Sequence, residues 1–139
     1  MAEFTAAAVQ TVAQNSNVIW TDTPVQGNCS IVHREGSGLV TLRALENGQC
    51  RSRFKITFGA NVAAVTAASA ISLAIAISGE PVSSTTMIVT PAAVNEYFNV
   101  NSSVYLDIPS SCCSQVSVEN ISTQSISIQN ANLIVERVA

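Results

Sequence analysis

The feature that most constrains this chain is the alternation of apolar and polar side chains with a period of two residues. The aromatic and aliphatic residues between Cys50 and Phe58 occupy every second position, with basic residues and a threonine between them. From Ile71 to Ile77 the large apolar groups stand only at odd positions, separated by serine or alanine. Successive side chains of a strand point to opposite faces, so both segments predict strands that are buried on one face.

Further short segments of this kind follow one another along the chain, with turn residues between them. The expected strands cover residues 18–20, 29–33, 39–42, 50–58, 70–77, 81–89, 97–108, 114–120, 126–128 and 133–138. The last of these is apolar on both faces, which indicates burial from two sides. We expect turns at Thr21–Pro24 and around Gly59 and Asn61, and one helical turn at Thr90–Val94 with Thr90 as its N-cap. Short strands with a turn roughly every 8–12 residues predict an all-β sandwich or barrel.

The composition points to a domain whose surface is partly covered by other chains. The 139 residues fit one domain, and only 11% of them are charged, against roughly 25% in ordinary soluble domains. A net charge of −3 argues against nucleic acid as a partner. The charge-free stretch from Ile56 to Gly79 is long enough to span a membrane, but its polar residues and its alternation favour strands instead. The start of the chain has no signal-peptide pattern, so we expect synthesis in a cytoplasm unless a non-standard route exports the chain.

The first 17 residues differ from the rest. They are mostly small and polar, with one charge at Glu3, and alone they cannot bury enough surface to offset their ordering entropy. We therefore divide the chain into an N-terminal arm, residues 1–17, and an all-β domain, residues 18–139. The arm is expected to dock on a partner, either the next subunit or a protein shell beneath it, with Phe4 as its anchor. A frayed terminus is the alternative, and an integral first strand would mean that this boundary lies too late.

No arrangement of residues points to catalysis or to a bound cofactor. His33 is the only histidine, and nothing marks a nucleophile or an orienting acid for it. The carboxylates Asp22, Glu80, Glu96 and Asp107 are scattered, so no pair is singled out. We expect no enzyme and no cofactor.

The four cysteines are expected to be reduced thiols that the fold does not need. They are Cys29, Cys50, Cys112 and Cys113. A disulfide formed after cell lysis is the alternative. Zinc binding is disfavoured because paired Cys-x-x-Cys spacing is lacking.

Arg51, Arg53 and Lys55 form a basic strip on one face of the clearest expected strand. This strip is either a solvated, salt-bridged face or a docking site for an acidic partner such as a protein shell or a glycan. Nucleic acid is disfavoured because no aromatic residues are interleaved for base stacking. The aromatic residues Trp20, Tyr97, Phe98 and Tyr105 are expected in the core or in a subunit interface, whereas an exposed cluster of them would bind sugar.

The order of strand and turn signals resembles the trimeric jelly roll of the tumour-necrosis-factor and complement-globular-head superfamily, in the version of bacterial and phage surface proteins. The residues that carry the resemblance are 31–42, 48–58, 71–79 and 114–128, and it extends from about Val18 to Val138. It implies a homotrimer, for which we predict an interface including Tyr105, Leu133 and Val135. Some relatives hold calcium on the threefold axis, where Asp22 or Asp107 could serve.

The chain lacks the collagen-like stalk and secretion signal of many relatives, and this favours a phage virion protein. The predicted function is a homotrimeric capsid decoration protein that clamps and stabilises the head of a phage particle, without a reaction. Two alternatives stay open. One is a receptor-binding or fibre-tip module that recognises a bacterial surface glycan, and the other is a bacterial surface-layer or spore-coat protein.

Overall fold

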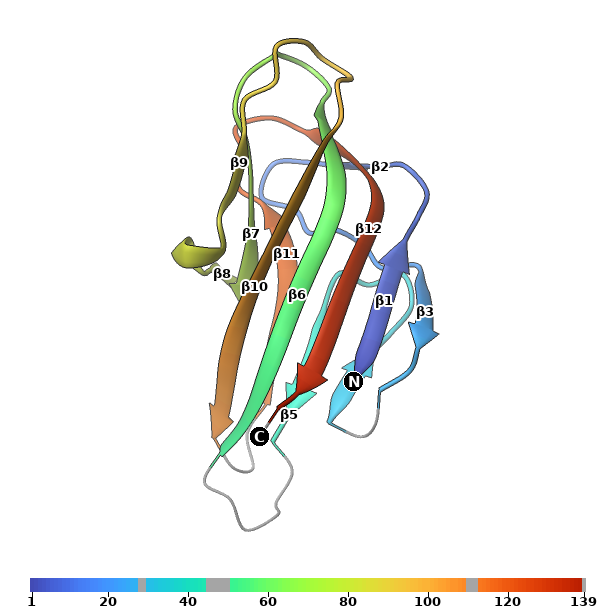
Figure 1. Cartoon of the computed structure of the whole chain (residues 1–139), viewed down its shortest axis with the longest axis vertical. Coiled ribbons are helices and arrows are strands. Elements are labelled where there is room, and N and C mark those ends of the chain that lie inside the picture. Colours follow the sequence, from blue (N-terminus) through green and yellow to red (C-terminus); the bar gives the residue numbers. More distant parts are fainter. Residues whose placement is uncertain (28–29, 45–50, 110–112, 139) are drawn as a thin grey trace.

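The computed structural model describes residues 1–27, 30–44, 51–109 and 113–138. These residues form two antiparallel β-sheets packed face to face as a jelly-roll sandwich, which confirms the all-β prediction (Figure 1). The single helical element among them is a short 3-10 turn, η1 (Ser83–Thr85). None of the helical structure described has the length and apolar character of a membrane span.

The first sheet has the strand order β10-β6-β12-β1-β3, with β2 paired to β12. Its strands are β10 (Phe98–Pro109), β6 (Arg51–Ala64), β12 (Ile126–Arg137), β1 (Ala2–Ala6), β3 (Asp22–Val25) and β2 (Gln10–Val12). The long strands β6 and β10 pair along their whole common length, from Phe98 opposite Val62 to Pro109 opposite Arg51. Pro24 lies in β3, which is an edge strand. An edge strand tolerates proline because the missing N–H does not interrupt hydrogen bonding between central strands.

The second sheet has the order β4-β5-β11-β7-β8, with β9 also paired to β7. Its strands are β4 (Ile31–His33), β5 (Val40–Arg43), β11 (Cys113–Asn120), β7 (Ile71–Ile77), β8 (Glu80–Pro81) and β9 (Met87–Val89). Ser78 and Gly79 join β7 to β8 and have positive φ values of 53° and 85°. Two positive φ angles in a two-residue loop are typical of a type I′ hairpin turn, which glycine adopts without strain.

The core fills the space between the two sheets. Phe4, Trp20, Phe54 and Phe58 are among the largest fully buried side chains, and the Trp20 ring meets Phe58 edge-on at 6.0 Å between centroids. Along β6 every second residue from Ser52 to Val62 is buried, while the residues between them are half-buried on the outward face. The predicted period-two alternation is therefore confirmed in β6.

Four local predictions are wrong. Gly59 and Asn61 lie inside β6 and pair with β10, where Gly59 leaves space for the Asn132 side chain of β12. Residues 90–94 form bends and the start of a turn, not a helical turn, and the expected turn at Thr21–Pro24 is largely the strand β3. Residues 18–20 are outside the strands, although Val18 and Trp20 are fully buried. At Gly59 and Asn61 and in β3, pairing with a strand distant in sequence overrides the local turn signal.

The N-terminal segment is not a detached arm. Strand β1 lies between β12 and β3, with Phe4 opposite Leu133, and Phe4 is 2% exposed. The boundary between residues 17 and 18 is therefore corrected, and Phe4 anchors its own domain. Ala2, Phe4 and Ala6 face the core while Glu3 and Thr5 face outward. This short alternation contains only one large apolar residue, so its signal in the sequence is weak.

From Ala131 to Arg137 the last strand is buried on one face only. Leu133 and Val135 are fully buried in the core of this chain, so the prediction that they form a subunit interface is corrected. On the outward face of β12, Ile134 is half-buried and Glu136 is exposed. Cys113 lies exposed in β11, whereas Cys29, Cys50 and Cys112 lie outside the described residues.

Candidate functional site: a basic end of the sandwich

The predicted basic strip lies on the outward face of β6, beside side chains from two neighbouring strands. Arg53 stands opposite Asp107 of β10, and Lys55 stands between Tyr105 of β10 and Glu136 of β12. Side chains directly opposite each other on one face of a sheet are in contact range. The strip is therefore one row of a mixed cluster of charged residues and an aromatic ring, drawn from three strands.

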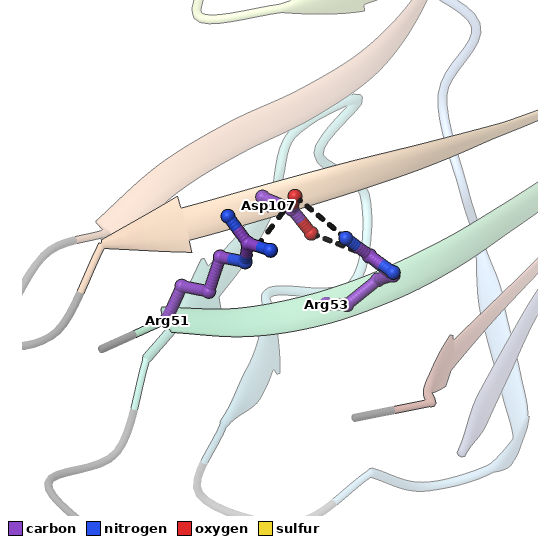
Figure 2. Close-up of polar contacts among 3 residues, drawn as sticks. All are labelled: Arg51, Arg53 and Asp107. Carbon is purple, nitrogen blue, oxygen red and sulfur yellow. Dashed lines mark hydrogen bonds and ion pairs between the residues drawn. The ribbon is translucent and has the colours of Figure 1, made fainter. Parts of the chain in front are cut away.

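Asp107 holds both arginines of the strip (Figure 2). The Arg53 guanidinium donates two hydrogen bonds to this carboxylate, from Nε to Oδ1 at 2.7 Å and from Nη2 to Oδ2 at 3.1 Å. Arg51 is more loosely placed, with its Nε 3.7 Å from Oδ2 and its side chain 63% exposed. The bidentate pair fixes Arg53 in one orientation, while Arg51 remains available to a partner.

The pair also shifts the acid–base equilibria of both residues. The hydrogen bond from Arg53 lowers the pKa of Asp107, and the positive charges of Arg53 and Arg51 add to this effect. The same hydrogen bond and the charge of Asp107 raise the pKa of Arg53. Asp107 is thus a carboxylate acceptor at neutral pH, but an exposed pair of this kind adds little stability because water screens it.

The topology brings two further cations to the same end of the sandwich. Strand β5 ends at Arg43 and β12 ends at Arg137, at the end where β6 begins with Arg51. This is the lower end in Figure 1, where the C-terminus also lies. We call the set Arg43, Arg51, Arg53, Lys55 and Arg137 the basic end. It holds five of the six basic residues of the chain.

The charge of the basic end contrasts with the rest of the molecule. Among the described residues, the five cations of the basic end lie beside two acidic side chains, Asp107 and Glu136, so positive side chains outnumber negative ones there. The other described residues contain one cation, Arg34, against six acids, namely Glu3, Asp22, Glu35, Glu80, Glu96 and Glu119. Glu46 lies outside the described residues, in the connection between β5 and β6.

A recess opens beside the ion pair. Arg53, Tyr105, Asp107 and Val138 line it, and its volume is about 440 Å³. Tyr105 is 62% exposed, so its ring is open to solvent and is not part of the core. Exposed aromatic rings next to charged groups are common in binding sites, because the ring offers an apolar face and a polar hydroxyl.

The other predicted site residues lie elsewhere. His33 is half-buried, with Nε2 3.0 Å from the Ser37 carbonyl oxygen and its ring 4.7 Å from that of Phe4. Asp22 is exposed on β3, remote in the sheet order from Asp107 on β10. Within the part of the chain that the structure describes, no three His, Cys, Asp or Glu side chains are grouped so that they could hold a metal ion.

Sequence reasoning found the strip but missed Asp107 as its partner, and it missed Arg43 and Arg137. The alternation in residues 97–108 places Asp107 and Tyr105 on one face, which was an available signal. The pairing of Asp107 with Arg53, 54 residues away, depends on strand register, which no local pattern supplies.

Comparisons with known proteins identify similar folds but no related sequence. No family model and no curated protein sequence matches the chain. Among solved structures, the globular domain of zebrafish complement 1qA is similar, with a TM-score of 0.64 and 12% identity over 96% of this chain and 94% of that one. This likeness shows a shared jelly-roll fold. Murine APRIL is also similar, with a TM-score of 0.50 and 8% identity over 91% of this chain and 96% of that one.

Proposed function

We propose that the chain is a homotrimeric structural and binding module, not an enzyme, on the outside of a phage particle, where it decorates and stabilises the head. The observation that supports trimer formation is an uncharged face on the first sheet. The fold likeness to the complement 1qA globular domain supports this proposal, and the phage setting depends on the resemblance found in the sequence.

The uncharged face covers the middle of three adjacent long strands. It consists of Thr57, Gly59, Asn61, Asn99, Asn101, Ser103, Asn132 and Ile134, which point outward from β6, β10 and β12. Asn99 donates a hydrogen bond to Asn61 across β10 and β6 at 3.2 Å. Amide and hydroxyl groups can bond to a second copy without the cost of burying a charge. A face of this chemistry is suited to symmetric self-association.

The basic end begins one row beyond the uncharged face, at Lys55 and Tyr105. If the threefold axis runs along the length of the sandwich, three basic ends point the same way. Weak contacts to an acidic partner are then multiplied, because the second and third contacts form within one complex. The basic end is the proposed partner-binding end of the module, and a receptor-binding module is the second candidate because Tyr105 is exposed there.

The trimer is tested by sedimentation equilibrium of the intact protein. We expect three chains for the wild type and dissociation for Asn101→Lys, because a lysine at the centre of a covered face places like charges together. Such juxtaposition costs several kcal/mol, which weakens assembly by about a hundredfold or more. Ser84→Lys, on an exposed residue of η1, is the matched control and should remain trimeric. A monomeric wild type at micromolar concentration contradicts the proposal, and a trimeric Asn101→Lys variant places the interface elsewhere.

A further inference from the structure

We propose that the recess beside Tyr105 binds an acidic saccharide, that is, a sugar unit with a carboxylate group, through Tyr105, Arg53 and Asp107, with Arg51 and Lys55 receiving the carboxylate. This inference deepens the proposed function by naming the ligand class of the basic end. The site lies within one chain, so it does not need the trimer.

Tyr105 provides the apolar contact. Tyr105 is 62% exposed and lies in a strand whose other outward residues, except Pro109, are Asn, Ser or Asp. One face of a pyranose ring carries C–H groups and packs against an aromatic ring, while the hydroxyl groups at its edge remain free for hydrogen bonds. An isolated exposed ring surrounded by polar groups fits that two-sided chemistry better than it fits a dry protein interface.

The ion pair provides fixed hydrogen-bonding groups. Arg53 uses Nε and Nη2 on Asp107, which leaves Nη1 and the second Nη2 hydrogen as donors. Each oxygen of Asp107 retains a lone pair that can accept a hydrogen bond from a hydroxyl. Two neighbouring hydroxyl groups of a sugar can donate and accept hydrogen bonds side by side. The Arg53 guanidinium is already ordered by Asp107, so it loses little entropy when it binds them.

The surrounding charge favours an acidic sugar over a neutral one. Arg51 makes only the long contact of 3.7 Å to Asp107, and Lys55 stands directly opposite Tyr105. The volume of about 440 Å³ is within the roughly 300–1,000 Å³ usual for small-ligand sites. An acidic protein surface would need roughly 800 Å² on each partner and would not use a concave recess.

The test is isothermal titration of the intact protein with three probes. These are trigalacturonic acid, its methyl ester, which keeps the rings and removes the charge, and a hexaglutamate peptide. We expect the acid to bind best, the ester more weakly, and hexaglutamate weakest. Tyr105→Ala should weaken binding of both saccharides at least tenfold, whereas Arg51→Gln and Lys55→Gln should weaken only the acid. Tyr97→Ala and Arg34→Gln, which lie away from the basic end, are the aromatic and charge controls.

Two results would overturn the saccharide proposal. One is hexaglutamate binding as tight as that of the acid with no effect of Tyr105→Ala, which would indicate an acidic protein partner such as the shell. The other is the absence of binding to either saccharide. Repeating the titration with Asn101→Lys separates this proposal from that of the trimer. If the dissociated variant still binds the acid, the saccharide site stands without the trimer. If the wild type is trimeric but binds no sugar, the saccharide proposal is wrong and the trimer proposal stands.

Discussion

At the scale of single residues, Asp107 organises the candidate site. Its carboxylate orients Arg53 through two hydrogen bonds and lies 3.7 Å from the Arg51 guanidinium. The lowered pKa of Asp107 means that the folded state favours its ionised form. Its contribution to stability is therefore present above the pKa of the unfolded carboxyl group and is lost as pH falls through the lower folded pKa.

The acid–base behaviour of this pair can be measured directly. An NMR titration of the Asp107 carboxyl should give a pKa below that of an ordinary aspartate, and Arg53→Gln should raise it because the principal hydrogen bond is removed. Arg34→Gln should leave the pKa of Asp107 unchanged. An ordinary Asp107 pKa in the wild-type protein would mean that the pair does not persist in solution.

At the scale of strands, alternation predicted β7 and β10 well, and β6 as far as Phe58, because each has several large apolar groups on one face. In β11 the two valines on one face, Val116 and Val118, gave the same signal. The same reasoning failed for β1, since Ala2 and Ala6 carry little apolar signal. Burial of β1 comes from its pairing with β12 and β3, which no local pattern specifies. The composition of the first residues could therefore not show that they complete a sheet.

The role of β1 as a structural strand predicts a large effect of a single substitution. Phe4→Ala should destabilise the domain by about 3–5 kcal/mol, because it removes a fully buried ring and leaves a cavity. Urea unfolding followed by circular dichroism measures this. Val9→Ala, at a side chain that is 60% exposed just after β1, should change stability little. Equal, small effects of the two substitutions would restore the view of the segment as a loose arm.

At the scale of the whole molecule, the charge is unevenly distributed. The sequence shows a chain with a net charge of −3, and from that value alone an acidic partner looks unfavourable. The fold gathers five of the six basic residues at one end, because β5, β10 and β12 end there and β6 and β11 begin there. The direction of a local field, and not the sum of charges, decides which partner approaches this end.

This asymmetry predicts that an acidic protein will adhere to an anionic surface by one end. At pH 7 and low salt, a sulfonate cation-exchange resin should retain the wild type even though its isoelectric point is about 4.9. Retention should fall steeply near 0.1 M salt, where the Debye length is about 10 Å. Because Arg51 and Lys55 belong to the basic end, the double variant Arg51→Gln/Lys55→Gln should elute much earlier than Arg34→Gln. The double variant loses two positive charges and Arg34→Gln loses one, so the two shifts in elution salt are compared per charge removed. A double variant that elutes with the wild type, or a wild type that flows through at low salt, would show that the basic end exerts no net attraction.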